Sequence, residues 1–530
     1  MVVKIDDKTL EEHYSKFLNR QTDRRVLLQF WDDFLPEGVK PHPKPCILAA
    51  GMPNEGLFPI ESVHLNVVDR PFQHNDYPFK SGKLHRNGDD GEGTFDEKEY
   101  VKSKVDEGTM VDIWRYEPSN PENIPIARAL QYGDTKGLPQ ILKFTKELVT
   151  YLNKPAYDNW DIMMANGSSD SLSKVFTILS DEDVTVLMEE FTFTPTISNV
   201  TSCGGIPIPL KCDITDDPKE QGINVAYMTE LLDNWTTGPY SHLSKPKLLY
   251  TIPTGQNPTG MTQCVEKRKQ IYALCEKHDI IIVEDDPYGY LTFLPYDQTN
   301  PMKNLYTDGT ITYDKYCKEI LTPSYLTIDT SGRVIRLETF SKVFAPGIRL
   351  SFIVANSFIL DKISKYADIS VRGACGISQA MTANIIEKWS HAFEGDHVKA
   401  WLSWVMKIAG EYTRRRNVLF QALESTPAFK DGLFDLVEPS AGMFVSVVVN
   451  IDKLNVTDRL KAMDAVNYTL IEEGCIVILG YRMAVDRKFS YDRSNFLRIT
   501  FAMAPDDEHL QTAAERLGKG IERFFKEYKN

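Results

Sequence analysis

The sequence predicts an α/β protein in which a mostly parallel sheet lies between helices, followed by a smaller α+β unit. From about residue 136 onward, helical and strand-like segments alternate, which is typical of βαβ units. Residues 280–283 form a continuous apolar strand, the kind that a parallel sheet buries on both faces. The end of the chain instead mixes strands with longer helices, as an α+β unit does.

Length and composition define the class of protein. The chain has 530 residues, of which 42% are hydrophobic and 25% charged, values typical of a globular protein with a large core. A formal net charge of −14 argues against nucleic acid or an anionic membrane as the main partner. We see no run of 18 apolar residues, so we predict no membrane span.

The eight cysteines are scattered and include no C-x-x-C pair, which argues against zinc and dithiol redox chemistry. Reduced thiols and an N-terminus without an apolar or basic leader predict a cytoplasmic protein. We therefore expect no metal in the functional site.

The predicted elements follow in chain order. Residues 8–34 suggest an amphipathic helix and a short aromatic segment, and 41–45 a Pro-rich extended stretch. Two polar stretches, about 74–125 and 295–330, read as surface excursions. Other predicted helices cover 139–153, 167–179, 263–277, 357–368, 377–425, 457–472 and 506–527. Predicted strands cover 162–164, 184–188, 206–210, 280–283, 333–337, 350–355, 433–437, 443–449 and 495–501, and one more ends at 250–252.

The first candidate site is the loop between the strands at 333–337 and 350–355, which contains Lys342 and Arg349. Two cations this close repel each other unless an anion lies between them. Burial or neighbouring positive charge also lowers the pKa of a lysine and makes it a nucleophile. The loop therefore indicates a reactive lysine beside a phosphate-sized anion, with a solvated loop lysine as the alternative.

The second candidate site is the start of the helix at 167–179, where Ser168 and Ser169 follow a glycine. Free N–H groups and hydroxyls at a helix start can hold a phosphate. The alternative is an ordinary helix N-cap, which serine also favours.

Two further motifs lie at strand ends, where doubly wound sheets bind ligands. Asn257 is held in a tight Pro-Gly turn and is suited to give one well-aimed hydrogen bond, although the turn alone explains its glycines. Asp285, within a run of three acids, could pair with a cationic ring nitrogen, and Tyr288 could reach a phenolic oxygen on the same ring. Alternatively the acids cap the next helix; a metal is disfavoured because no histidine lies nearby.

Arg498 interrupts an apolar strand near the end of the chain. A buried arginine requires an anion. The anion is either a carboxylate of the protein or a substrate carboxylate gripped through two hydrogen bonds.

In this order, Asn-Pro-Thr-Gly at 257–260, Glu-Asp-Asp-Pro-Tyr at 284–288, Ser-Lys at 341–342 with Arg349, and the late Arg498 resemble fold-type-I pyridoxal 5′-phosphate (PLP)-dependent aminotransferases. Residues 51–54, 131–132, 191–195 and 438–444 are most similar to the fungal aromatic aminotransferase II group, close to the kynurenine/α-aminoadipate group. The resemblance implies a seven-stranded large domain at 51–385, a small domain at 386–530, and an arm at 1–50 packing with the small domain. It also implies a homodimer with its active site at the interface.

The resemblance also implies a role for each residue. Lys342 would form the Schiff base with PLP and shuttle the substrate proton, and Asp285 would keep the ring nitrogen protonated. Asn257 and Tyr288 would bind the phenolic oxygen. The remaining implied contacts are Ser168, Ser169, Thr339 and Arg349 to the phosphate, Tyr132 to the phosphate of the neighbouring subunit, Phe193 to the ring face, Arg498 to the substrate α-carboxylate, and Gly51 and Asn257 beside the substrate.

The predicted function is transamination of Phe, Tyr or Trp with 2-oxoglutarate or another 2-oxo acid such as phenylpyruvate. Alternatives on the same scaffold are a kynurenine or 2-aminoadipate aminotransferase and a β-lyase. A non-catalytic PLP-fold sensor is a more distant alternative, because residues 1–50 are too short and not basic enough for a DNA-binding domain.

Overall fold

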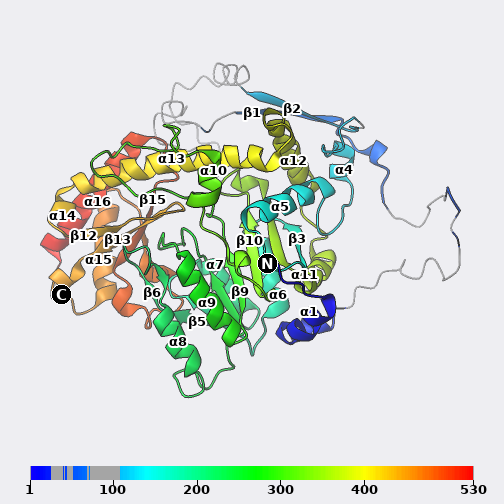
Figure 1. Ribbon diagram of the computed structural model, residues 1–530. Helices are drawn as coiled ribbons and strands as arrows, with labels where there is room; N and C mark the ends of the chain where they lie inside the picture. The colour runs from blue at the N-terminus through cyan, green and yellow to red at the C-terminus, as the bar shows by residue number, and fades with distance from the viewer. Residues whose placement is uncertain are drawn as a thin grey trace.

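The computed structural model describes residues 2–25, 40, 42–44, 52–68, 71, 108–117 and 119–528. Its centre is a seven-stranded sheet (Figure 1). In spatial order the strands are β3 (Trp160–Ala165), β11 (Ser351–Asn356), β10 (Val334–Thr339), β9 (Ile281–Asp285), β8 (Leu248–Thr251), β4 (Thr185–Glu189) and β5 (Ile206–Leu210). Only β11 runs antiparallel to its neighbours, so the predicted mostly parallel sheet is confirmed.

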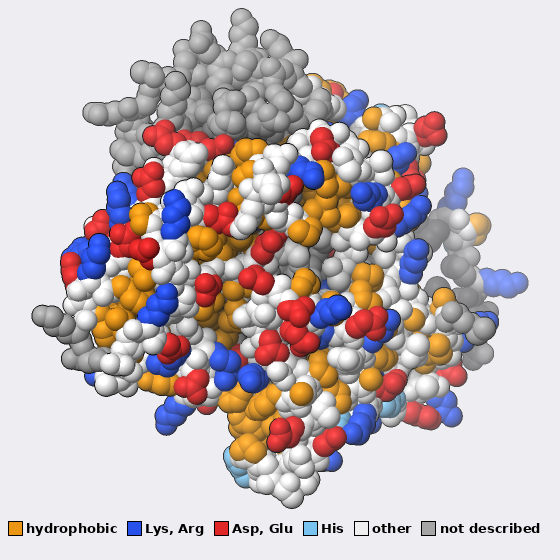
Figure 2. All heavy atoms as spheres, turned by 60° about the vertical axis from the view of Figure 1, so that its left-hand side comes forward, with side chains coloured by type: hydrophobic (Ala, Val, Ile, Leu, Met, Phe, Trp, Pro, Cys, Tyr) orange, Lys and Arg blue, Asp and Glu red, His pale blue; other side chains and the backbone are white. Residues whose placement is uncertain are grey.

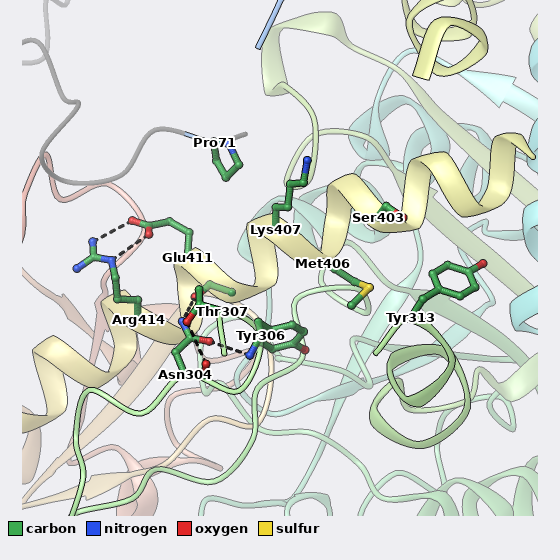
Figure 3. Close-up of a pocket in the computed structure, with 11 residues that line it drawn as sticks. Pro71, Asn304, Tyr306, Thr307, Tyr313, Ser403, Met406, Lys407, Glu411 and Arg414 are labelled. Carbon is green, nitrogen blue, oxygen red and sulfur yellow. Dashed lines mark hydrogen bonds and ion pairs between the residues drawn. The ribbon is translucent and has the colours of Figure 1, made fainter. Parts of the chain in front are cut away.

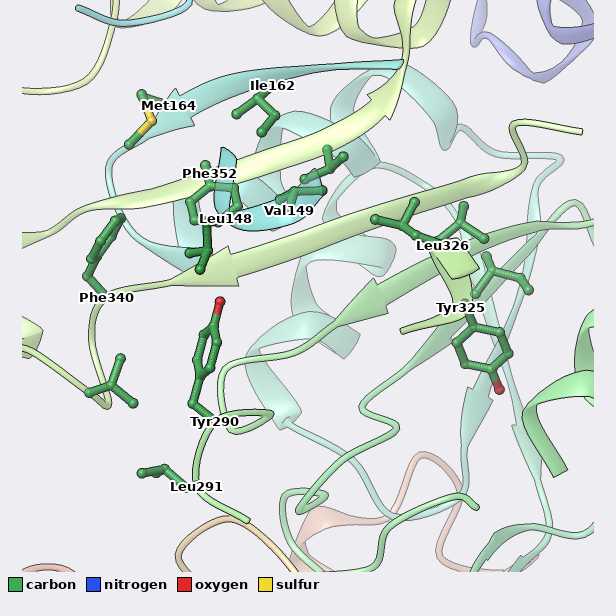
Figure 4. Close-up of a cluster of buried hydrophobic side chains, with 14 of the residues drawn as sticks. Leu148, Val149, Ile162, Met164, Tyr290, Leu291, Tyr325, Leu326, Phe340 and Phe352 are labelled. Atoms are coloured by element: carbon green, nitrogen blue, oxygen red, sulfur yellow. The ribbon is translucent and has the colours of Figure 1, made fainter. Parts of the chain in front are cut away.

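Helices cover both faces of this sheet and bury two separate hydrophobic clusters. One face carries α5 (Pro139–Leu152), α8 (Val225–Asp233), α9 (Val265–Lys277) and α12 (Gly376–Ser390), and the other α6 (Ser168–Leu179), α7 (Thr194–Ser202) and α11 (Ser357–Ser370). In β9, Ile282 belongs to the first cluster and Val283 to the second, which explains why the strand is apolar at every position. Figure 4 shows part of the first cluster.

The smaller unit is a four-stranded antiparallel sheet with the order β12 (Phe434–Val437), β13 (Phe444–Val449), β15 (Phe496–Thr500) and β14 (Ile478–Leu479). The helices α15 (Arg459–Glu472) and α16 (Asp507–Glu527) pack against it. The unit lies in orange and red at the left of Figure 1.

A long helix, α13 (His397–Ser425), joins the two units and runs in yellow across the top of Figure 1. Trp401 packs in the core of the larger unit and Leu423 in that of the smaller one. The single helix predicted at 377–425 is wrong, because Glu394 and Gly395 adopt positive φ angles and separate α12 from α13. Because α13 packs in both hydrophobic cores, it does not belong to one unit alone. The predicted domain boundary at residue 385 stays a proposal.

The N-terminal arm packs differently from the prediction. In α1 (Asp7–Tyr14), the buried Leu10 and Tyr14 join the cluster formed with α6 and α11. The Asn19 side chain donates to the carbonyl oxygens of Thr177 and Ser180 at 2.7 and 2.9 Å. Residues 2–25 therefore lie on the larger unit rather than the small domain, because their apolar stripe fits the α6–α11 face. Within them the helix predicted at 8–34 is broken into short pieces that end with α2 (Arg20–Asp23), and the aromatic segment at 30–34 lies outside the described residues.

The two predicted polar excursions are more ordered than expected where the structure describes them. Residues 108–117 contain β2 (Thr109–Trp114), which pairs with β1 (Ser62–Val67) and packs near α4 (Ile126–Leu130) and α12. Residues 72–107 lie outside the described residues. In the 295–330 stretch, Tyr316 and Tyr325 are fully buried, and each phenol donates one hydrogen bond inside the core.

On the face drawn in Figure 2, acidic and basic side chains are interspersed. No helix in the described part of the chain combines the length and apolarity that crossing a membrane requires. In the same residues, no group of three or more His, Cys, Asp or Glu side chains could hold a metal ion.

Candidate active site

The predicted site residues follow the carboxyl ends of five strands that lie on one edge of the large sheet. The strand pairing aligns Leu337 of β10 with Asp285 of β9, and Glu284 of β9 with Thr251 of β8. Carboxyl ends of parallel strands meet at one edge, and open α/β sheets bind ligands there. Asp285 and Thr339 are the last residues of β9 and β10. The segments after β3, β4, β8, β9 and β10 supply Ser168, Ser169, Phe193, Asn257, Tyr288, Lys342 and Arg349.

The start of α6 and Arg349 form a cradle for an anion. Arg349 adopts a left-handed backbone conformation (φ 48°) and donates to the carbonyl oxygen of Asn166 at 3.2 Å. Gly167 has φ 85°, a backbone conformation that residues with a side chain rarely adopt, and a Cβ atom there would also displace this guanidinium. Ser168 is half-buried and Ser169 exposed in the first helical turn. Free helix N–H groups beside an exposed guanidinium favour a phosphate.

Thr339 ends β10 at the same level as this cradle. Its hydroxyl lies 2.9 Å from the Ser341 hydroxyl and donates to the Leu350 carbonyl oxygen at 3.2 Å. Its neighbour in the sheet is Ser351, which itself pairs with Ala165, the last residue of β3. Thr339 therefore lies two strands from the end of β3, which leads into α6.

Lys342 lies in the loop directly after Thr339 and is half-buried. Burial and the positive charge of Arg349 lower the pKa of its amine, while Asp285 opposes the shift. No described residue forms a hydrogen bond or an ion pair with the Lys342 ammonium. A lowered pKa leaves more of the amine neutral and nucleophilic.

Asp285 is a buried carboxyl group with one satisfied and one open oxygen. Oδ2 accepts a hydrogen bond from the Tyr250 phenol at 2.8 Å. Oδ1 is buried and has no hydrogen-bond partner among the described residues. Burial raises the pKa of this carboxyl to about 7. A buried acceptor without a donor is costly, and the pyridinium N–H of PLP is a donor that fits it.

The three acids at 284–286 separate in the structure. Arg336 forms ion pairs with Glu284 at 3.0 Å and with Asp286 at 2.7 Å. Successive side chains of a strand point to opposite faces, so Asp285 points away from this arginine and toward the site. Asp285 accepts from the Tyr250 phenol, whereas Glu284 accepts from the Tyr325 amide at 3.2 Å, so the three acids do not act together as a cap of one helix.

Arg498 meets the same site from the small unit. Its guanidinium donates to the Asn257 side-chain oxygen at 2.9 Å and lies 4.6 Å from the centre of the Phe444 ring. The buried Tyr288 contacts the same ring edge-on at 5.8 Å, and Asn257 lies close enough to act on its phenol. None of the carboxylates that the structure describes pairs with Arg498. Its remaining N–H groups are therefore available for a substrate carboxylate.

Three predicted residues are less closely tied to this cluster. Phe193 is half-buried at the start of α7 and packs in the same hydrophobic cluster as Tyr288 and Phe444. Tyr132 is 60% exposed just after α4. Gly51 lies outside the described residues.

Two acids that support the site from below are not among the residues predicted from the sequence. Glu189 is fully buried and accepts hydrogen bonds from the Ile252 amide at 3.0 Å and from Gln256 at 3.3 Å, which anchors the turn that carries Asn257. The adjacent Glu190 accepts three hydrogen bonds from the Arg493 guanidinium, which link the two units. Glu189 ends a buried apolar strand and Glu190 follows it, as Asp285 ends β9. The same signal in the sequence, acids at the end of an apolar strand, therefore also marks these two residues.

Figure 3 shows a separate cavity of about 350 Å³ beside α13, lined by Tyr306, Tyr313, Met406 and Arg414 among others. None of the predicted site residues lines it. It lies apart from the strand ends and is not part of the candidate site.

Residues 121–517 match the family described as aminotransferase class I and II, and the chain belongs to this family. The chain is 43% identical to aromatic amino acid aminotransferase 2 of Saccharomyces cerevisiae, an alignment covering 99% of this chain and 98% of that one. It is 28% identical to the L-tyrosine:2-oxoglutarate aminotransferase amt1 of Serpula lacrymans, over 81% and 87% of the two chains. The structure also superposes on the crystal structure of the aromatic aminotransferase Aro9 from C. albicans with a TM-score of 0.83. The two sequences are 38% identical, and the superposition covers 97% of this chain and 98% of that one.

The predicted resemblance and the fold class are therefore confirmed. The chain is an aminotransferase with the seven-stranded fold of that class.

Proposed function

We propose that this enzyme uses PLP to move the amino group of Phe, Tyr or Trp to 2-oxoglutarate or another 2-oxo acid such as phenylpyruvate. The use of PLP is supported mainly by Asp285, because its buried Oδ1 has no hydrogen-bond donor among the described residues. Asp285 lies at the same edge of the sheet as Lys342 and the anion cradle. The aromatic preference is supported by the names of the fungal relatives.

Each part of the cofactor has a matching group in this chain. Asp285 would face the ring nitrogen, Asn257 and Tyr288 the phenolic oxygen, and Phe193 the ring face. The phosphate would be held by the cradle, whose members are Ser168, Ser169, Thr339 and Arg349. When bound, PLP supplies an electron sink for the electron pair left on the substrate Cα.

The chain's own groups perform the remaining steps. Lys342 would be the residue that holds the cofactor covalently. Once the substrate amine has displaced it, its Nζ would move the proton from the substrate Cα to C4′ of the cofactor, and in the opposite direction when the oxo acid is the substrate. Arg498 would hold the α-carboxylate of the amino acid and then of the oxo acid, since both carry this group. Asn257, which pins Arg498 at 2.9 Å, would align the carboxylate with the cofactor.

We expect the purified holoenzyme, mixed with Phe, Tyr or Trp alone, to convert its cofactor to the pyridoxamine form. Adding 2-oxoglutarate or phenylpyruvate should then restore the starting absorbance. Single-turnover spectra with these donors, and with kynurenine and 2-aminoadipate, measure the preference. Formation of ammonia and a 2-oxo acid without the pyridoxamine form would instead indicate a lyase and contradict the proposal.

A homodimer is part of the proposal, because Tyr132 would reach the phosphate of a neighbouring subunit. Tyr132 is 60% exposed. Leu57, in a short helix at Glu55–Leu57 beside α4, is also exposed, as are Trp114 at the end of β2 and Tyr116 just after it. Large exposed apolar side chains favour association. We expect sedimentation of the holoenzyme to give twice the mass of one chain, whereas a fully active monomer would contradict this assembly.

The proposed compartment is the cytoplasm. The seven cysteines in the described part of the chain, which excludes Cys46, are all free thiols. Free thiols are typical of a reducing compartment.

A further inference from the structure

We infer that Tyr250 is a positioning residue of this site: its phenol holds one oxygen of Asp285 so that the other stays free for the ring nitrogen. The inference rests on the proposed use of PLP. Tyr250 Oη donates to Asp285 Oδ2 at 2.8 Å, and Oδ1 is the buried oxygen without a partner among the described residues.

Sheet geometry brings these two side chains together. Tyr250 in β8 pairs with Val283 in β9, and Asp285 follows Val283 by two residues. Paired residues, and residues two apart, share one face of a sheet. The hydrogen bond is thus a diagonal contact between neighbouring strands, and both partners are rigid parts of the sheet. A site held by strands is more accurately placed than one held by loops.

The phenol is a dedicated donor. Tyr250 is fully buried, and burial keeps its pKa well above the ordinary value, so the proton stays on the phenol. The buried Thr196 of α7 lies next to this phenol and belongs to the first turns of the helix that Phe193 begins. Tyr250 therefore lies between the carboxyl group proposed for the ring nitrogen and the helix that carries the proposed ring-stacking residue.

The hydrogen bond also acts on the charge of Asp285. It stabilises the ionised carboxylate and so opposes the burial that raises the pKa to about 7. The other groups acting on Asp285 are Asp286, which raises its pKa, and Arg336 and Lys342, which lower it. The charge of Asp285 raises the pKa of the Tyr288 phenol, and the charge of Glu189 raises the pKa of the Tyr250 phenol. Without the phenol, neither oxygen of Asp285 would have a donor among the described residues.

The test uses Tyr250→Phe, which removes one oxygen atom and keeps the ring. The apoprotein is titrated with PLP between pH 6 and 9, and binding is followed by tryptophan fluorescence. We expect affinity at neutral pH to fall about tenfold to a hundredfold, the effect of one hydrogen bond to a charged group. The pH at which binding reaches half its maximal strength should rise, because Asp285 ionises at higher pH in the variant. In turnover, kcat should fall while the KM for the amino acid stays the same.

The matched control is Tyr14→Phe. Tyr14 is also buried, and its phenol donates to the Ser331 carbonyl oxygen at 2.8 Å, away from the site. We expect this variant to lose comparable thermal stability as apoprotein and to bind PLP with wild-type affinity and pH dependence.

The outcomes separate this inference from the proposed function. If the wild-type apoprotein binds no PLP, the proposed function fails. If the wild type binds PLP and Tyr250→Phe matches it in affinity and pH midpoint, only the positioning role is overturned. An unfolded Tyr250→Phe protein, judged by circular dichroism, would also overturn it, because the phenol would then be a determinant of folding. In an Asp285→Asn background, Tyr250→Phe should lose its effect on the pH midpoint.

Discussion

Replacing Lys342 by alanine is expected to abolish transamination, with a loss in kcat of at least about 10⁴-fold. General acid–base catalysis alone contributes up to roughly this factor, and the variant also loses covalent attachment of the cofactor. The amine is half-buried beside Arg349, and its lowered pKa suits both roles. Turnover of an aromatic amino acid with 2-oxoglutarate measures the first effect. The visible absorbance band of the lysine-bound cofactor, recorded across pH, measures the second.

The control for this prediction is Lys365→Ala. Lys365 lies on α11, where its ammonium pairs with Asp361 at 2.8 Å, and both side chains are more than 40% exposed. We expect wild-type turnover and an unchanged absorbance band from this variant. Full turnover of Lys342→Ala together with a retained pH-dependent band would refute the assignment of the reactive lysine.

The large sheet could be predicted because its physical signals are local. Residues 280–283 are apolar at every position because both faces of the strand are buried: Ile282 packs in one core and Val283 in the other. The candidate site was predictable for a related reason. Asn257, Asp285 and Lys342 each follow a strand, and a mostly parallel sheet brings such ends to one edge.

Other features depend on contacts that no local pattern encodes. The pair Tyr250 and Asp285 requires that β8 and β9 be neighbours, and strand order cannot be read from apolar periodicity. The apolar stripe of residues 2–25 predicts that this arm packs on a hydrophobic surface, but it does not predict that the surface is the one formed by α6 and α11. The break between α12 and α13 depends on positive φ angles at Glu394 and Gly395, and only the glycine signals this locally.

Replacing Arg498 by alanine is expected to raise the KM of the amino acid and of the oxo acid together, by about 30-fold to 3,000-fold. Truncating one partner of a buried charged pair costs roughly 2–5 kcal/mol, and each 1.4 kcal/mol is about tenfold. Both substrates carry an α-carboxylate, and none of the carboxylates in the described part of the chain occupies this guanidinium. Half-reactions measured separately with Phe and with 2-oxoglutarate give the two values.

Two further variants show whether the effect comes from the guanidinium fork. Arg498→Lys keeps the charge but cannot form the paired hydrogen bonds, so its KM values should lie between those of wild type and alanine. Arg516→Ala, which removes an exposed arginine whose contact is the Gly474 carbonyl oxygen at 3.2 Å, should leave both values unchanged. Arg498 donates to the Asn257 side chain at 2.9 Å, so Asn257→Ala should also raise the KM values of both substrates. A loss confined to one substrate in Arg498→Ala would mean that the two acids bind in different places, and the shared-carboxylate role would have to be abandoned.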